Sequence, residues 1–277
     1  MKLNSEFEQF WENGYIIVRE AFEKEEMQII KRVITLQHEI NQRVEDVRER
    51  ILEGERPFFE TIFVWNDTAR HDIFAKATRS HKIMERLEFF YGDEVYVYHN
   101  KVALKYPGII GFAYHQDYAY WYGMGNLYPD MASAFIAVDK SNKQNGCLKI
   151  IEGSHKMGRI DHVFNDGVAN SEVCPDRLAV ILKKLPEVHL ELNAGDMVIF
   201  HCNTLHGSDD NNSKNSRIAL IGTYNTKHNN PYPTNHTHPN YQPQAKVYER
   251  ITEADMNALP DFELEFLDQT TDACSSL

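Results

Sequence analysis

EVYVYHNKVALKYPGIIGFAYHQD, residues 94–117, is the segment that decides the fold class of this 277-residue chain. It contains two β-forming stretches, 94–104 and 112–118, separated by a turn with Pro and Gly. Further stretches of the same kind follow at 132–138, 147–152, 187–193, 197–202 and 217–225. Short strands divided by Gly, Pro, Asn and Asp predict an antiparallel β-sandwich or barrel, because βαβ units would place helices between them.

The residues before this segment predict helices instead. Residues 4–13 predict a short helix, and 15–18 a β segment that Asn13-Gly14 separates from it. Apolar residues recur every three to four positions from 25 to 53, which predicts one amphipathic helix packed against the sheet. A coiled-coil dimer through the same apolar stripe is the alternative. A further helix is predicted over 71–91.

The chain contains no internal repeat and no Gly/Ser-rich or Pro-rich linker that would divide it, so we predict one domain. Residues 1–91 form its mainly helical N-terminal part, 92–226 its β core, and 227–277 a C-terminal loop and acidic tail. Within these parts, 157–186 is expected to be a helical or irregular insertion. The predicted fold class is mostly β with flanking helices.

The charge balance favours a small-molecule partner. With 29 basic and 41 acidic residues the net charge is −12, and no basic stripe is present, which argues against nucleic acid or an anionic membrane. No apolar run resembles a signal peptide or a membrane span. The cysteines lack CxxC spacing, which predicts free thiols in a reducing compartment. We therefore expect a cytoplasmic protein, either a monomer or a homodimer. The cysteines are Cys147, Cys174, Cys202 and Cys274.

Two histidines and one aspartate form a candidate metal site. In a strand, residues i and i+2 point to the same face, so His115 and Asp117 can reach one ion. A third ligand must come from elsewhere, and His206 lies just after the apolar stretch 197–200; His201 is the rival. Two imidazoles and one carboxylate suit Fe(II) and leave coordination positions open.

An arginine strengthens this interpretation. Residues 207–216 are polar and turn-rich, whereas Arg217 begins the apolar stretch RIALIG. A buried arginine requires an anionic partner to offset its desolvation. Its guanidinium group can bind a dicarboxylate through two parallel hydrogen bonds.

Together these motifs resemble the phytanoyl-CoA dioxygenase family of Fe(II)- and 2-oxoglutarate-dependent oxygenases. They occur in the family's order and span most of the chain. The resemblance implies a double-stranded β-helix core, a jelly roll of the cupin kind, flanked by helices. The residues that carry it are Asn13-Gly14-Tyr15, Tyr114-His115-Gln116-Asp117, Asn145-Gly146-Cys147-Leu148, Gly153-Ser154-His155-Lys156 and His206-Gly207-Ser208 with Arg217.

The resemblance also implies roles for individual residues. His115, Asp117 and His206 match the iron ligands, while Arg217 and Ser208 match the groups that hold the far carboxylate of 2-oxoglutarate. Three further residues match or fall near positions beside this cosubstrate: Gln116, Lys101 and Phe135, the last in place of a common tryptophan.

The reaction type follows from the same resemblance. Because Asp117 is retained where halogenating relatives have a small residue, the implied reaction is hydroxylation, with consumption of O2 and release of succinate and CO2. Ascorbate can support such a reaction in vitro.

An aromatic cluster surrounds the metal motif. Its members are Tyr114, Tyr118, Tyr120, Trp121 and Tyr122. They represent either ordinary packing or a cage that binds a cationic, for example quaternary ammonium, substrate through cation–π contacts. Lys101 and Lys105 are an even number of residues apart in an expected strand, so both side chains can face the pocket of the metal motif. The alternative is that both lie on a solvent-facing strand edge.

Two other functions remain open from the sequence. A cupin-like hydrolase or isomerase could use Zn2+ or Mn2+ and bind a substrate carboxylate through Arg217. A non-catalytic small-molecule-binding module could retain the fold alone. Oxygen consumption separates the first from an oxygenase, and the intact set of three ligands and Arg217 argues against the second.

Overall fold

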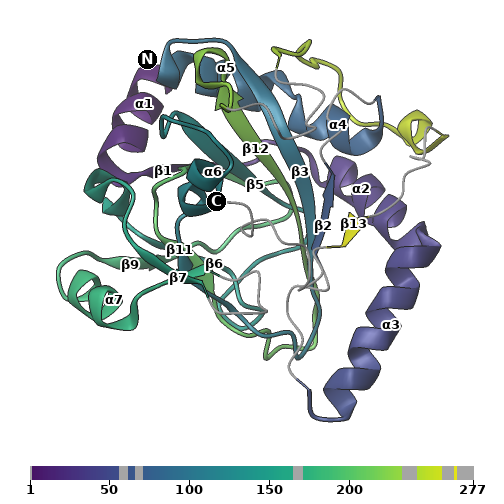
Figure 1. The fold of residues 1–277 in the computed structure, drawn as a ribbon. Helices are drawn as coiled ribbons and strands as arrows, with labels where there is room; N and C mark the ends of the chain where they lie inside the picture. The colour runs from purple at the N-terminus through teal and green to yellow at the C-terminus, as the bar shows by residue number, and fades with distance from the viewer. Residues whose placement is uncertain are drawn as a thin grey trace.

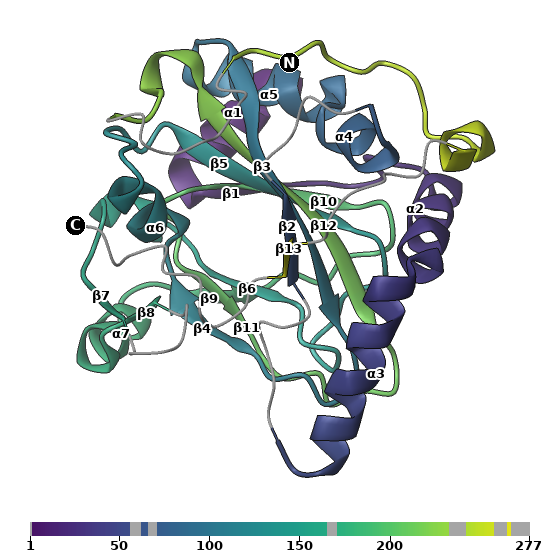
Figure 2. The same cartoon turned by 45° about the vertical axis from the view of Figure 1, so that its right-hand side comes forward.

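Two antiparallel sheets make up the centre of the computed structural model, which describes residues 2–55, 62–65, 71–164, 171–232, 242–257 and 265–266. The larger sheet has the order β1 (Tyr15–Val18), β10 (Met197–His201), β5 (Met131–Ala137), β12 (Arg217–Thr226), β3 (Val95–Lys105), β2 (Ile62–Trp65) and β13 (Glu265–Phe266). The smaller sheet has the order β4 (Phe112–His115), β11 (His206–Ser208), β6 (Leu148–Ile151) and β9 (Glu187–His189). Figure 2 shows the two sheets facing each other.

Alternation along β10 shows why the larger sheet is buried on both sides. Val198 and Phe200 belong to an apolar cluster that also contains Leu148 and Ile150 of the smaller sheet. Met197 and Ile199, which alternate with them, belong instead to the cluster beneath the helices. Because successive strand residues point to opposite faces, one strand supplies both layers of the core. The predicted mostly β fold with a jelly-roll core is confirmed.

Helices cover the outer face of the larger sheet (Figure 1). They are α1 (Lys2–Asn13), α2 (Lys24–Leu36), α3 (His38–Leu52), α4 (Ile73–Thr78) and α5 (His81–Tyr91). Phe10, Ile30 and Leu87 pack into one cluster with Ile136 and Leu220 of the sheet. The predicted role of the amphipathic stripe, burial against the sheet, is therefore observed. No helix in the described part of the chain combines the length and apolar character needed to cross a bilayer.

The prediction of one helix over 25–53 was wrong. Gln37 has an extended backbone (φ −73°, ψ 119°) and divides α2 from α3. The apolar stripe continues across this break, since Ile34 and Ile40 belong to the same cluster, so periodicity alone could not reveal it. The helix predicted over 71–91 is likewise two helices. Ser80 separates them, and its hydroxyl accepts a hydrogen bond from the backbone N–H of Lys82 at the start of α5.

The insertion predicted over 157–186 contains a β-hairpin as well as a helix. The 3-10 helix η2 (Ser154–Met157) leads into it, and its described elements are β7 (His162–Phe164), β8 (Ser171–Val173) and α7 (Pro175–Leu182). Strands β7 and β8 pair only with each other. Much of the predicted C-terminal loop and acidic tail at 227–277 lies outside the described residues.

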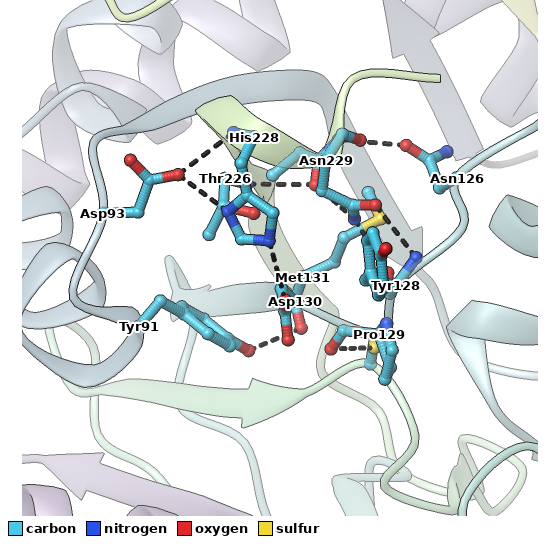
Figure 3. Close-up of polar contacts among 12 residues, drawn as sticks. Tyr91, Asp93, Asn126, Tyr128, Pro129, Asp130, Met131, Thr226, His228 and Asn229 are labelled. Carbon is cyan, nitrogen blue, oxygen red and sulfur yellow. Dashed lines mark hydrogen bonds and ion pairs between the residues drawn. The ribbon is translucent and has the colours of Figure 1, made fainter. Parts of the chain in front are cut away.

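A histidine bridges the end of β12 to two other elements (Figure 3). His228 lies in the 3-10 helix η3 (Lys227–Asn229), directly after β12. Its Nδ1 lies 2.8 Å from Asp93, which follows α5, and its Nε2 lies 3.0 Å from Asp130, which precedes β5. The same view shows the hydroxyl of Tyr91 donating to the backbone carbonyl of Met131 over 2.8 Å. These contacts fasten β12 and β5, two central strands of the larger sheet, where β12 ends and β5 begins.

Candidate active site

His115, Asp117 and His206 lie together between the two sheets. His115 ends β4, His206 begins β11, and the two are paired in the register of the smaller sheet. Asp117 Oδ1 lies 4.0 Å from His115 Nε2 and 3.8 Å from His206 Nε2. The three potential ligand atoms lie within 4.8 Å of one another, and no other such group occurs among the residues that the structure describes. One ion can therefore reach all three side chains.

Backbone carbonyls determine which nitrogen each histidine presents. Nδ1 of His115 lies 2.9 Å from the carbonyl oxygen of Ala113, and Nδ1 of His206 lies 3.0 Å from that of Thr204. A ring nitrogen beside a carbonyl oxygen must carry the proton and donate it. Each Nε2 is thus left with a lone pair directed toward the shared space, which is the usual arrangement of metal-binding histidines.

The charge states of the site also suit a metal ion. Burial, assisted by the neighbouring His206, lowers the pKa of His115 to about 3, so its imidazole is neutral. Burial alone would raise the pKa of Asp117, but electrostatic interaction with His206 and Lys101 lowers it to about 2. Ser133 Oγ also donates a hydrogen bond to Asp117 Oδ2 over 2.8 Å. The donor set therefore includes a carboxylate that is charged at neutral pH.

The expected strand over 112–118 ends earlier than predicted. β4 stops at His115, and Asp117 is the first residue of the helix α6 (Asp117–Gly123). His115 and Asp117 are therefore brought together by the extended backbone of Gln116 (φ −109°, ψ 132°) at the strand-to-helix junction. His115 and Asp117 were predicted correctly to lie together, but the predicted cause, their place two residues apart in one strand, was wrong.

Gln116 is placed differently from the prediction that it lies beside a cosubstrate. Its side chain is fully buried, and its Nε2 donates to the carbonyl oxygens of Gly158 (2.8 Å) and Asn203 (2.7 Å). Its Oε1 accepts from the backbone N–H of Ile160 over 2.9 Å. Gln116 is not among the residues that line the cavity described next. It instead fixes two chain segments around the ligands.

A cavity of about 100 Å³ adjoins the three ligands. Four of the predicted cosubstrate residues line it, together with His115, Asp117 and His206: Lys101, Phe135, Ser208 and Arg217. They come from four strands, β3, β5, β11 and β12, of which the first two are distant in the sequence from the last two. Apolar walls come from residues that the sequence did not single out: Phe112, Leu148 and Phe200.

Arg217 is a buried cation without a carboxylate partner in the described part of the chain. Its side chain is 4% exposed, and its Nε makes no hydrogen bond to the residues described. Burial lowers its pKa to about 10, so it remains charged at neutral pH. Its guanidinium carbon lies 5.5 Å from the centre of the Phe135 ring. An uncompensated buried charge is costly, and an anion bound in the cavity would offset that cost.

Ser133 is a functional candidate that the sequence reasoning missed. It lies on β5, whose sequence Met-Ala-Ser-Ala-Phe-Ile-Ala is apolar apart from this hydroxyl. A single polar residue in a fully buried strand was the available signal, because such a group requires a hydrogen-bond partner. Its partner is the carboxylate of Asp117.

The aromatic cluster is divided among different environments. Tyr118 and Trp121 are 4% and 2% exposed and pack in one apolar cluster, against which Tyr120 also packs. Tyr122 is exposed, and the guanidinium carbon of Arg159 lies 4.3 Å from its ring centre. Tyr120 contacts a ligand, with its ring centre 6.2 Å from that of His115 in an edge-on arrangement. These four of the five predicted aromatic residues thus lie near one another, but none of them lines the cavity beside the ligands.

His201, the rival ligand, faces a different part of the molecule. Its side chain is buried, with its ring centre 6.0 Å from that of Phe10 and 5.6 Å from that of Trp11. Its Nδ1 accepts a hydrogen bond from the backbone N–H of Asn203 over 3.0 Å. His201 is therefore part of the packing against α1.

The jelly-roll core and its site of two histidines and one carboxylate define the chain as a double-stranded β-helix protein with a candidate iron centre. The sequence model of the phytanoyl-CoA dioxygenase family matches residues 10–219, and the chain belongs to that family.

Relatives include the 2-aminoethylphosphonate dioxygenase of uncultured bacterium HF130_AEPn_1, 36% identical over 48% of this chain and 47% of that protein. The L-proline trans-4-hydroxylase of Streptomyces griseoviridis is 32% identical over 58% of this chain and 65% of its own length. The matched region thus spans less than two thirds of either relative. In fold, the chain is similar to EctD from S. alaskensis with 2-oxoglutarate and 5-hydroxyectoine. The TM-score is 0.65, at 18% identity over 89% of this chain and 86% of that one.

Proposed function

We propose that this chain is an Fe(II)- and 2-oxoglutarate-dependent dioxygenase that hydroxylates a small polar substrate and releases succinate and CO2. One observation carries the proposal: a buried arginine without a carboxylate partner in the described chain lines the same cavity as two histidines and an aspartate. A dicarboxylate that reaches from the metal to the guanidinium group would satisfy both.

His115, Asp117 and His206 would hold Fe(II), each through one atom, with the histidine tautomers already fixed by backbone carbonyls. Bound Fe(II) would supply the activation of O2 that is coupled to decarboxylation of 2-oxoglutarate. Ser133 keeps the carboxylate of Asp117 oriented through its hydrogen bond. The ligand set is thus preorganised by its neighbours, which limits the rearrangement needed on metal binding.

Arg217 and Ser208 would hold the far carboxylate of 2-oxoglutarate at the end of the cavity away from the ligands. Lys101, which also lines the cavity, adds positive charge. Phe112, Leu148 and Phe200 provide apolar walls that exclude water from the space between. In this low-dielectric surrounding, the contact between guanidinium and carboxylate is stronger than it would be in water.

The substrate class is proposed from the relatives and from the surface beside the ligands. The named relatives act on 2-aminoethylphosphonate and L-proline, both small and polar. Tyr120, edge-on to His115, offers a ring face for a cationic or quaternary ammonium group. The ring of Tyr122 already carries the guanidinium group of Arg159, which supports an acidic substrate group as the second candidate.

A turnover screen tests the proposed function. Protein reconstituted with Fe(II), 2-oxoglutarate and ascorbate is incubated with trimethylammonium compounds, amino acids and aminophosphonates, and succinate release and O2 consumption are measured together. Stimulation of both by one substrate supports the proposal. Metal-dependent conversion without O2 consumption would select a hydrolase or isomerase, and absence of metal binding would select a non-catalytic module.

For the intact protein we propose a cytoplasmic location. The free thiols of Cys147, Cys174 and Cys202, of which two are buried, support a reducing compartment. Size-exclusion chromatography with light scattering would decide between the proposed monomer and homodimer.

A further inference from the structure

Lys105 is a buried lysine for which the proposed reaction has so far supplied no role. It is the last residue of β3, its side chain is 2% exposed, and it forms no ion pair with a carboxylate of the described residues. It pairs across the sheet with Arg217. Burial, and then the positive charge of Arg217, lowers the pKa of Lys105 to about 6. Two basic residues side by side in the interior are costly unless an anion joins them.

The contacts of Lys105 lead to a residue of the cavity. Its Nζ donates a hydrogen bond to Ser208 Oγ over 2.8 Å and another to the backbone carbonyl of Asp209. Space around the amine is limited, because a Cβ added at Gly146 would lie 3.0 Å from Nζ. The amine is therefore held in place beside the hydroxyl of Ser208.

The hydroxyl of Ser208 receives two hydrogen bonds. Besides the bond from Lys105, the backbone N–H of Phe112 donates to Ser208 Oγ over 3.2 Å. A serine hydroxyl has two acceptor lone pairs and one proton. When Nζ of Lys105 and the N–H of Phe112 both donate to Oγ, both lone pairs are occupied, so the hydroxyl proton has to point elsewhere. The hydroxyl finds no acceptor among the described residues, and Ser208 lines the cavity together with Arg217.

We infer that Lys105 is a positioning residue of the anion site: by donating to Ser208 Oγ, it directs the hydroxyl proton into the cavity, where it joins Arg217 in binding the far carboxylate of 2-oxoglutarate. The inference rests on the proposed function and deepens it. It assigns the buried lysine to the cosubstrate end of the cavity. Lys105 acts through Ser208 and need not touch the ligand.

A ligand comparison tests this role without turnover. The affinity of the Mn(II)-loaded protein for 2-oxoglutarate and for 2-oxopentanoate, which lacks the far carboxylate, is measured by calorimetry. Lys105→Met, which keeps the length of the side chain and removes its donors, is expected to weaken 2-oxoglutarate binding about tenfold. It should leave 2-oxopentanoate binding unchanged. Equal losses for both ligands, or no loss for 2-oxoglutarate, would overturn the inference.

Lys149→Met is the matched control. Lys149 also contacts Asp209, through an ion pair of 2.6 Å with its carboxylate, but it makes no contact with Ser208 among those observed and does not line the cavity. Its loss should leave the affinity for both ligands unchanged. If Lys149→Met weakened 2-oxoglutarate binding as much as Lys105→Met, the effect would belong to the Asp209 segment and the inference would be wrong.

A double-mutant cycle separates positioning from direct attraction. If Lys105 acts through Ser208, then Lys105→Met should cause little further loss of 2-oxoglutarate affinity in a Ser208→Ala protein. Additive losses would show that Lys105 acts on the ligand independently and would contradict the inference. Lys105→Gln, which retains an N–H donor, serves as a milder variant should Lys105→Met fail to fold. If neither variant folds, Lys105 is a structural residue and the inference is wrong.

Failure of the proposed function has a different signature. In that case the wild-type protein itself would bind neither Mn(II) nor 2-oxoglutarate. Binding by the wild type with an unchanged affinity in Lys105→Met would leave the proposed function standing and remove only the role of Lys105.

Discussion

Two clusters of histidine and aspartate in this molecule use the same residue types for different purposes. In the site between the sheets, each of two histidines donates Nδ1–H to a backbone carbonyl and keeps Nε2 available near Asp117. Where β12 ends in the larger sheet, both ring nitrogens of His228 face carboxylates, those of Asp93 and Asp130 (Figure 3). The first arrangement presents lone pairs to an ion, and the second consumes both nitrogens in ion pairs.

Burial accounts for the remaining difference. It lowers the pKa of the enclosed His115, which favours the neutral imidazole that a metal requires. The side chain of His228 is 48% exposed, and its hydrogen bond with Asp93 raises its pKa, which favours the cation. Composition therefore does not distinguish a metal site from an ion-pair cluster. The two are distinguished by the partners of the imidazole nitrogens: in the metal site one nitrogen donates to a backbone carbonyl and the other stays available, whereas in the ion-pair cluster both face carboxylates.

The largest expected effect comes from removing the carboxylate of the enclosed cluster. Asp117→Ala leaves two buried imidazoles without the anionic ligand and should lower turnover by at least about 1000-fold. Fe(II) binding, measured by equilibrium dialysis, should fall with it. Asp130→Ala, the matched change in the exposed cluster, should leave turnover within about twofold of wild type. Comparable losses in both variants would mean that the two clusters do not differ as described.

The second effect concerns the buried cation beside the enclosed cluster. Arg217→Met removes the guanidinium group and should raise the KM for 2-oxoglutarate about 100-fold, since breaking a buried charge pair costs a few kcal/mol. The KM for the prime substrate should change much less. Arg19→Met is the control, because the side chain of Arg19 is 55% exposed and has its own carboxylate partner, Asp196. An unchanged KM for 2-oxoglutarate in Arg217→Met would remove the cosubstrate assignment.

The sequence allowed the members of the enclosed cluster to be predicted because their spacing and surroundings were informative. Arg217 was recognisable as a charged residue at the start of an apolar strand, a pattern that the sequence alone contains. The helix that begins at Asp117 could not be recognised from the sequence. The side chain of Gln116, directly before it, makes hydrogen bonds to Gly158 and Asn203, which are distant in sequence.

The exposed cluster could not be predicted for the same physical reason. Asp93, Asp130 and His228 follow or precede different elements, and no local pattern connects them. Their proximity results from the pairing of β12 with β3 and β5. Strand periodicity gives the face of each residue, whereas contacts at strand ends depend on register and loop conformation.

A smaller effect should follow from the hydroxyl that supports Asp117. Ser133→Ala removes one hydrogen bond to the carboxylate, and the loss of such a supporting contact typically weakens metal binding about tenfold or somewhat more. Ser141→Ala is the matched control, because the hydroxyl of Ser141 is also buried but makes no hydrogen bond within the described structure. Competitive titration with a chromogenic Fe(II) chelator measures both. Equal affinities in the two variants would contradict a supporting role for Ser133.

The smallest effect is the pH dependence of the exposed cluster. The folded-state pKa of His228 is raised above its ordinary value of 6.5, so its protonated form stabilises the fold. That contribution, about 0.5 kcal/mol for an exposed ion-pair network, is fully present below pH 6.5 and is lost as the pH rises through the folded-state pKa. His228→Asn should therefore lower the free energy of unfolding at about pH 5.5 and leave it nearly unchanged at about pH 9. Urea denaturation at both pH values measures this difference. If His228→Asn instead lowered the free energy of unfolding more at high pH, His228 would stabilise the fold as a neutral ring. His115 is expected to do so, and the contrast between the two clusters would then no longer hold.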